Sequence, residues 1–265
     1  MGAHSDRALL LRRFPYGESS LVCHALTRAS GRVHVLAKGA YRPSSRYYAA
    51  LDLFDTLELE WSATAGRELG VLVAASIETR RAAIPRDLEA FRAATTALEL
   101  AALGSHEGSA DPALFDALER TLDSLAAGVG PQAALVEFEL AFLHNLGLAP
   151  ALSACASCGG VAPPLEQGSP ADARVAFSAS SGGRLCTACA IAARAAGRRV
   201  GTLPAAVLEQ AAAILAGRTR ANELPHEALE RVRDFVARFL EVQLESRPAS
   251  YRRFLSASNR NAARP

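Results

Sequence analysis

The segment Arg32-Val-His-Val-Leu-Ala37 alternates Val33, Val35 and Ala37 with Arg32, His34 and Leu36, and it decides the fold of the N-terminal part of the chain. A period of two is typical of a strand with one face buried. The same period recurs at Leu57–Trp61 and Val71–Ile77, and apolar runs near Leu9–Arg13 and Leu21–Thr27 add two earlier strands. Glycines that suit turns separate the runs: Gly17, Gly31 and Gly66. Five short antiparallel strands predict a small closed barrel of the OB type.

After Pro85 the apolar residues recur at helical spacing. Helices are expected near Leu88, at Asp111-Pro112, where an N-cap residue precedes a first-turn proline, and at Pro131, with Gly147 ending the third. Two more are expected from Pro204 and Pro225, whereas Gly159–Ser181, rich in proline and small residues, is expected to be a loop.

The predicted fold class is therefore α+β: an N-terminal five-stranded OB-fold β-barrel, followed by an α-helical domain with an inserted four-cysteine zinc module. We expect a DNA-binding barrel over 1–80 and a helical domain over 81–255. The zinc module is expected over 151–195, and a disordered tail over 256–265.

The composition limits the classes of function. Of 265 residues, 50% are hydrophobic, which is enough for a buried core, and the formal net charge is only +2. Any basic nucleic-acid surface must therefore be local. No signal peptide and no membrane-spanning stretch are apparent, so we expect a cytoplasmic protein without membrane contact. In a reducing compartment, clustered cysteines are expected to bind metal rather than form disulfides.

The pairs Cys155-Ala-Ser-Cys158 and Cys186-Thr-Ala-Cys189 predict a structural Zn²⁺ site. Each pair presents two sulfurs from one tight turn, and four thiolates close the coordination sphere, which leaves no position for a catalytic water. The alternatives are four unrelated buried cysteines or a dithiol redox pair. Cys23 stands alone on a predicted strand and is expected in the core.

A basic and aromatic segment without acidic residues extends from Arg28 to Arg46. Cations follow phosphates and flat rings stack on bases without reading sequence, so this combination predicts single-strand binding. The alternative is a solvated, charged connection between strands. The candidate DNA-binding residues are Lys38, Arg42, Arg46, Arg28, Arg32, Tyr41, Tyr47 and Tyr48. A second basic stretch without acidic residues follows Glu245, with Arg247, Arg252, Arg253, Arg260 and Arg264.

Motifs for catalysis are missing from the sequence. No P-loop, GxSxG or HExxH is present, and the six histidines are scattered. We therefore expect no catalytic residues and a protein that is not an enzyme.

In this order, these segments resemble the RecO family of bacterial DNA repair proteins, from about Arg7 to Leu255. The first half carries Pro15-Tyr-Gly-Glu-Ser-Ser-Leu21, Thr27-Arg-Ala-Ser-Gly-Arg-Val33 and Ala37-Lys-Gly-Ala40. The second half carries Phe138-Glu-Leu, Leu146-Gly-Leu-Ala-Pro150, Phe177, Gly182-Gly183 and both cysteine pairs.

The resemblance implies a recombination mediator in the repair of DNA damage, associated with the nucleoid. Such a protein binds single- and double-stranded DNA, anneals complementary strands, contacts the acidic C-terminal tail of single-strand-binding protein, and acts with RecR to load RecA. The resemblance also implies that Lys38, Arg42 and Arg46 bind DNA, because they lie in the matching segment. For the partner tail it points to the C-terminal helices, where the candidates are Arg231, Arg233 and Arg238.

Two other classes of function compete with this interpretation. One is a zinc-ribbon protein that binds RNA or the transcription or translation machinery, which substrate preference and strand annealing would distinguish. The other is an enzyme, either a zinc hydrolase, against which the closed four-thiolate site argues, or a redox protein without metal.

Overall fold

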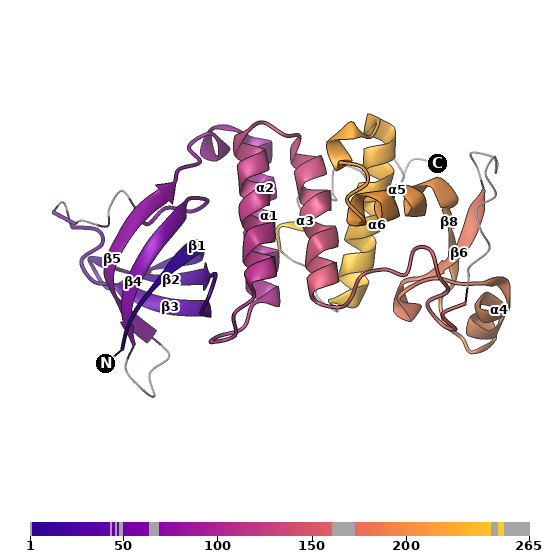
Figure 1. Ribbon diagram of the computed structural model, residues 1–265, viewed down its shortest axis with the longest axis horizontal. Coiled ribbons are helices and arrows are strands. Elements are labelled where there is room, and N and C mark those ends of the chain that lie inside the picture. Colours follow the sequence, from indigo (N-terminus) through magenta and orange to yellow (C-terminus); the bar gives the residue numbers. More distant parts are fainter. Residues whose placement is uncertain are drawn as a thin grey trace. The chain divides into compact units, whose positions relative to one another are not determined.

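The computed structural model describes residues 2–42, 44–45, 47, 50–63, 69–160, 173–244 and 249–251 (Figure 1). Its contacts divide the chain into two compact units, Met1–Pro131 and Gln132–Pro265, which are described separately below. The predicted disordered tail, 256–265, lies outside the described residues. The domain limits predicted from the sequence, at 80 and 81, stay a prediction.

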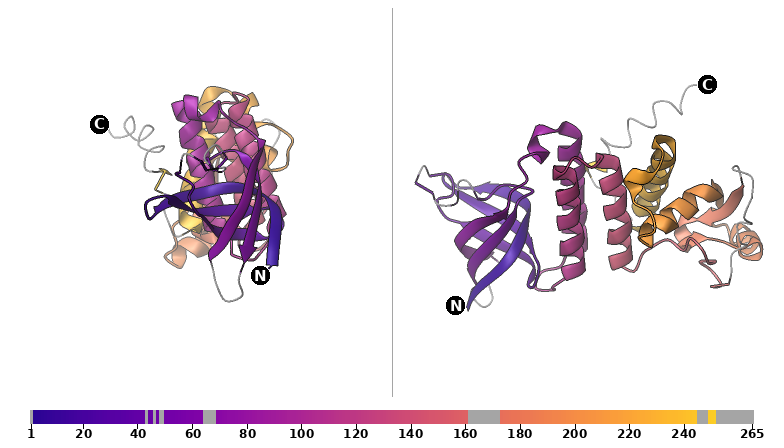
Figure 2. Two further views of the ribbon diagram at one scale, coloured as in Figure 1. Left: turned by 90° about the vertical axis from the view of Figure 1, so that its left-hand side faces the viewer. Right: turned by 45° about the horizontal axis from the view of Figure 1, so that its top comes forward.

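Five strands close a barrel in the first unit, as the sequence predicted (Figures 1 and 2). They are β1 (Gly2–Tyr16), β2 (Ser20–Thr27), β3 (Gly31–Ala37), β4 (Thr56–Ala63) and β5 (Leu69–Thr79), in the order β1-β2-β3-β5-β4. One detail differs from the expected antiparallel pairing, because β3 and β5 pair in parallel, with His34 opposite Leu69. The reason is topological: β3, β5 and β1 all run in one direction, so the pair that closes the barrel is parallel.

The predicted alternation places one set of side chains inside the barrel. Cys23 lies opposite Val35, both fully buried, whereas their neighbours His24 and His34 face each other on the outside. The buried set also includes Ala8, Leu10, Leu21, Ala25, Ala37, Leu57, Leu59, Trp61 and Leu72. The expectation that Cys23 is a core residue is confirmed.

A β-bulge in β1 changes which residues reach the outer face. Leu10 pairs with the inward Ala25, but Arg12, two residues later, pairs with the outward His24. Residues two apart on a regular strand share a face, so the bulge at Leu11 reverses the faces of the rest of the strand. Phe14 and Tyr16 therefore follow Arg12 onto the outside of the barrel.

Two helices complete the first unit: α1 (Leu88–Gly104) and α2 (Pro112–Ala126), after the 3-10 turn η1 (Ile84–Arg86). Asp111 accepts a hydrogen bond from the backbone N–H of Leu114 at 2.9 Å, which confirms the predicted N-cap. Arg81, at the end of β5 and only 3% exposed, attaches the barrel to α2. Its guanidinium donates to Asp123 at 2.7 Å and to the carbonyl of Phe54 at 2.8 Å.

The second unit combines α3 (Pro131–Asn145), α5 (Ala205–Leu215) and α6 (His226–Gln243) with a small three-stranded sheet. The sheet has the order β7-β6-β8, from β6 (Arg174–Ser178), β7 (Gly183–Arg184) and β8 (Gly201–Pro204). The 3-10 turns η2 (Ala179–Ser181) and η3 (Ala221–Glu223) and the helix α4 (Thr187–Ala195) complete it. No helix in the described part of the chain is long and apolar enough to cross a membrane.

The expectation of a continuous loop over Gly159–Ser181 is wrong for its last third, because residues 174–178 form strand β6. Phe177 explains the difference: its ring is buried against Phe235 and Phe239 of α6, with ring centroids 5.3 and 6.0 Å apart. This contact is distant in sequence, so local composition did not reveal it. Residues 161–172 lie outside the described part.

Candidate metal centre and nucleic-acid interface

The four cysteines of the two pairs meet at one place in the second unit, as predicted. The Sγ atoms of Cys155, Cys158, Cys186 and Cys189 all lie within 4.8 Å of one another. Sulfurs around a tetrahedral zinc at about 2.3 Å lie about 3.8 Å apart, so the group needs little adjustment to enclose an ion. The four cysteines can therefore hold a metal ion.

Local backbone structure aims each pair of sulfurs. In the first pair, the N–H of Gly159 donates to the carbonyl of Cys155 at 2.8 Å, and the N–H of Cys155 donates to the carbonyl of Gly160 at 2.9 Å. Gly159 adopts a positive φ of 69°, which favours glycine. In the second pair, Cys186 is the N-cap of α4 and Cys189 lies in its first turn. A tight turn and a helix start thus face each other.

The thiols of Cys155 and Cys189 have pKa values that are shifted in opposite directions. Burial would raise the pKa of Cys155, but hydrogen bonds from the backbone of Cys186, Cys158 and Ser157 outweigh it and lower the pKa to about 6. Hydrogen bonds with Cys186, Cys158 and Cys155 raise the pKa of Cys189 to about 12. As four thiolates these groups would repel one another, and a bound cation would compensate their charge, which fits a metal in a closed, structural site.

One part of the predicted DNA-binding segment forms an exposed cationic corner at the end of β3. Lys38, Tyr41 and Arg42 are all exposed, Tyr41 at 49%. The N–H of Arg42 donates to the carbonyl of Gly39 at 3.1 Å, and the N–H of Tyr41 donates to the carbonyl of Ser19 at 2.9 Å. Neither Lys38 nor Arg42 forms an ion pair within the described part of the chain. Both charges are thus available to a phosphate.

Arg28 and Arg32 lie away from this corner. Arg28 precedes β3 and Lys38 follows it, so the two are separated by the length of the strand, roughly 20 Å. Arg28 makes a bidentate ion pair with Asp116, at 2.8 and 3.0 Å. Arg32 donates to the carbonyl of Ala102 at 2.9 Å. Arg28 and Arg32 are therefore not part of the corner that Lys38 and Arg42 form.

The predicted tyrosines also differ in exposure, because Tyr41 is exposed and Tyr47 is buried. Tyr47 is only 7% exposed and its hydroxyl donates to the carbonyl of Val73 at 2.8 Å, so its ring belongs to the barrel core. A buried ring cannot stack on a base, and the expectation for Tyr47 is corrected accordingly. Arg46 and Tyr48 lie outside the described residues, and so do the basic residues after Glu245.

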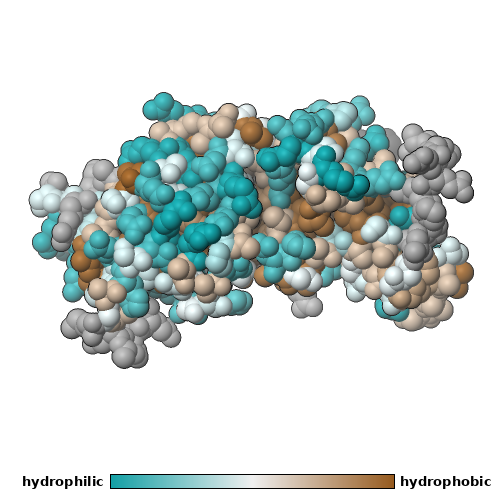
Figure 3. Space-filling model, in the orientation of Figure 1, coloured by the Kyte–Doolittle hydropathy of each residue, from teal (hydrophilic) through white to brown (hydrophobic). Residues whose placement is uncertain are grey.

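Two exposed aromatic residues of β1 escaped the sequence reasoning. Tyr16 and Phe14, 57% and 43% exposed, face outward from β1 beyond the bulge. Tyr16 pairs with Ser20, whose hydroxyl accepts the N–H of Gly39, next to Lys38. In the view of Figure 3 the first unit is mostly hydrophilic with scattered hydrophobic residues, as suits a surface for a polar partner. The signal in the sequence was the pair of aromatic residues in Phe14-Pro-Tyr16, directly before the first turn.

The three candidate arginines of α6 are not equivalent. Arg231 and Arg238 are exposed and form long ion pairs within the helix, at 3.7 Å to Glu227 and 3.9 Å to Asp234. Arg233 is buried and pairs with Glu139 at 3.0 Å, so it belongs to the core rather than to a binding surface. The apolar residues beside them are also buried: Val232, Val236, Phe239 and Leu240. The expectation for Arg233 is corrected, and the apolar face of α6 is occupied by the core.

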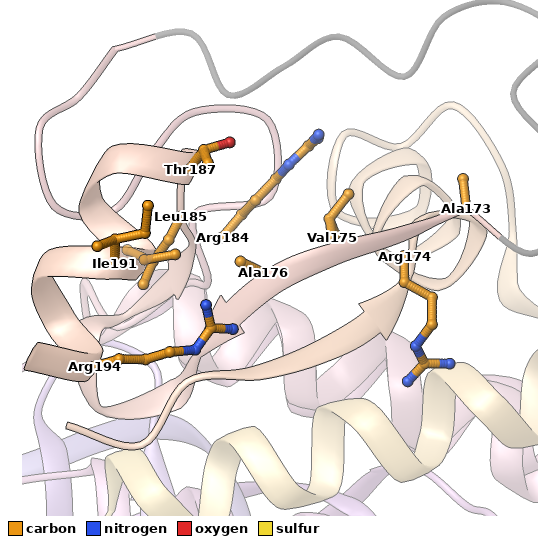
Figure 4. A pocket seen from close by; sticks show the side chains of 10 residues that line it. Ala173, Arg174, Val175, Ala176, Arg184, Leu185, Thr187, Ile191 and Arg194 are labelled. Carbon is orange, nitrogen blue, oxygen red and sulfur yellow. The ribbon is translucent and has the colours of Figure 1, made fainter. Parts of the chain in front are cut away.

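A cavity of about 300 Å³ lies between β6 and α4 (Figure 4). Val175, Leu185 and Ile191 supply apolar lining, and no acidic side chain is among the described residues that line it. Its cationic residues are Arg174, Arg184 and Arg194. Arg174 donates to Thr202, whereas Arg194 and Ile191 are exposed on α4. The cavity thus combines apolar lining with positive charge.

Comparisons with known proteins cover nearly the whole chain. Residues 1–80 match the family described as Recombination protein O N terminal, and residues 85–252 match Recombination protein O C terminal. DNA repair protein RecO of Anaeromyxobacter dehalogenans (strain 2CP-1) is 36% identical over 94% of this chain and 96% of its own. The RecO protein of Myxococcus xanthus is 30% identical over 93% and 96%, and that of Exiguobacterium sibiricum is 35% identical over 67% of each chain.

Proposed function

The chain belongs to the RecO family of DNA repair proteins, and from this premise we propose that it is a recombination mediator that binds single- and double-stranded DNA and anneals complementary strands. The observation that supports DNA binding most directly is the exposed corner of Lys38, Arg42 and Tyr41, whose charges are free of intramolecular ion pairs in the described residues. Arg46 and Tyr48 remain proposed members of this surface on the basis of sequence alone.

Annealing requires neutralisation rather than bond chemistry. Two strands repel through their phosphates, and a few cations reduce that repulsion enough for complementary bases to meet. Exposed rings such as Tyr41 and Tyr16 hold bases without reading their sequence, so a strand can shift until its partner is in register. The activity proposed here is therefore non-enzymatic.

The metal is proposed to be Zn²⁺ in a structural role. Four sulfur donors suit zinc, and no ligand position is left for substrate. The surrounding core is small: the cluster contains Cys155 itself with Leu185, Ala190 and Ala193. Such a core gains most of its stability from the metal.

The second unit is proposed to bind the acidic C-terminal tail of single-strand-binding protein, and the protein to act with RecR so that RecA is loaded. Because such a protein acts on chromosomal DNA, we propose that it is located in the cytoplasm, at the nucleoid. An acidic tail with an apolar end needs cations around an apolar recess. Arg231 and Arg238 supply exposed cations, and the cavity between β6 and α4 supplies both features.

The decisive experiment is an annealing assay with complementary oligonucleotides, in the presence and absence of single-strand-binding protein. The chain should accelerate annealing in both cases. The double variant Lys38→Glu/Arg42→Glu should lose most of the acceleration, whereas Arg198→Glu/Arg199→Glu, an equal charge change on exposed residues of the second unit, should retain it. A wild-type chain that does not accelerate annealing, or that prefers RNA, would contradict the proposed function.

A further inference from the structure

Three neighbouring strands bring Arg12, His24 and His34 into one row on the outer face of the barrel. Arg12 lies opposite His24 on β1 and β2, and His24 lies opposite His34 on β2 and β3. The two imidazole rings are stacked, with centroids 3.9 Å apart and an interplanar angle of 27°. The edge of Phe14 approaches His24 with a centroid distance of 5.1 Å. This row lies two residues along β1 from the exposed aromatic pair.

A cavity of about 230 Å³ opens beside this row. Leu11, Arg12, His24 and Arg32 line it from the barrel, and Ala102 and Leu103 line it from α1. The Nε of Arg32 is buried and has no hydrogen-bond partner within the described residues. An arginine N–H left without an acceptor in a recess is unfavourable unless an acceptor enters, so this atom points to a missing ligand.

The charges around the cavity are mostly positive. Arg12 comes from β1 and Arg32 from β3, and α1 lines the cavity with Leu103 and with Ala102, whose carbonyl accepts from Arg32. The Glu107 carboxylate lies 3.4 Å from His34 Nδ1 and 3.9 Å from Arg32 Nη2, and it offsets part of this positive charge. Burial lowers the pKa of His24, and His34, Arg32 and Arg12 lower it further, while Glu107 opposes them.

We propose that this cavity binds a phosphate group of the DNA strand and that His24 takes up a proton from solvent when it does. The inference rests on the proposed DNA-binding function and extends its surface from Lys38 across the outer face of β1, β2 and β3. His34 and Lys38 are four residues apart along the chain, roughly 13 Å, so one strand can contact both. The exposed strand face of an OB barrel is where oligonucleotides are generally held.

The direction of the proton linkage follows from the charges. Without ligand, burial and then the positive surroundings lower the pKa of His24 and so favour its neutral form. A phosphate in the cavity adds a negative charge within contact distance and favours the imidazolium, so it raises the pKa of His24. Binding then takes up a proton between the two pKa values, and affinity rises as pH falls. One proton corresponds to at most about a tenfold change per pH unit.

The test is the affinity of an oligothymidylate, whose bases do not titrate in this range, between pH 5.5 and 7.5 at constant ionic strength. Wild-type affinity should rise several-fold as the pH falls. His24→Gln should flatten the profile, because glutamine cannot take up the proton. His226→Gln, an exposed histidine of α6, is the matched control and should keep the wild-type profile.

A second measurement does not depend on any variant. The His24 resonance of the wild-type chain is titrated by NMR in chloride, in sulfate and with the oligonucleotide. The oligonucleotide should raise its pKa. A rise with sulfate alone would indicate a site for free anions and overturn the proposal, as would an unchanged pH profile in His24→Gln. A wild-type chain that binds no DNA at any pH would instead refute the proposed function.

Discussion

The Arg233 guanidinium and the Glu139 carboxylate form a 3.0 Å ion pair in the interior of the second unit, with Glu139 wholly buried and Arg233 8% exposed. Tyr251 completes the group, because its hydroxyl donates to the other carboxylate oxygen and its ring lies 5.3 Å from the guanidinium carbon. The pair joins α3 to α6. It therefore holds the helical core together and takes no part in a surface for partners.

Replacing Arg233 by methionine should destabilise the protein strongly. The change keeps the apolar volume but leaves the Glu139 carboxylate buried without its counter-ion, which costs about 3–5 kcal/mol. Urea unfolding of the metal-loaded protein measures this loss. Arg231→Met on the exposed side of the same helix should stay within about 0.5 kcal/mol of wild type, and equal effects of the two would contradict the assignment.

Charge reversal at Lys38 and Arg42 should weaken single-strand binding and make it less dependent on salt. Each lost phosphate contact reduces the slope of log affinity against log salt by roughly 0.7, so the double variant should lose roughly 1.4. Arg28→Gln is the informative comparison, because Arg28 is already paired with Asp116 and should change the slope less. A larger effect of Arg28→Gln would place the DNA path at the other end of β3.

Local sequence patterns predicted the parts of the molecule that local interactions determine. The alternation around Val33 and Val35 identified a barrel strand, and two short cysteine spacings identified the metal cluster. What the patterns missed depends on distant contacts. Tyr47 looked like a surface tyrosine among cations until the barrel was seen to enclose it, and Arg233 looked solvated because Glu139, its partner, is 94 residues away.

The thiols should react in two classes. With metal bound, the four clustered cysteines should be protected, and a chelator should expose all four to a thiol reagent. Cys23 should react only after unfolding, because burial raises its pKa to about 12. Metal content by mass spectrometry should show one zinc per chain, and Cys189→Ser should lower it. Five reactive thiols in the untreated native protein would rule out the site.

The acidic tail peptide should bind the second unit, and two variants locate where. Arg231→Glu/Arg238→Glu tests the exposed face of α6, and Arg194→Glu tests the cavity between β6 and α4. Fluorescence anisotropy at low and high salt should show weaker binding for at least one of them, with oligonucleotide affinity unchanged. Normal peptide binding by both would show that the tail is held elsewhere.

The bulge at Leu11 shifts the inward and outward alternation of β1 by one residue. A regular strand of the same sequence would turn Arg12, Phe14 and Tyr16 toward the lumen. Because the bulge accommodates Leu11 as an additional residue, these three side chains face outward instead. Deleting Leu11 would make the strand regular and leave the pairings with β2 unchanged, because Leu10 would still lie opposite Ala25 and Arg12 opposite His24. The strand thus tolerates an extra residue without losing its outward face, because the bulge confines the change to one position.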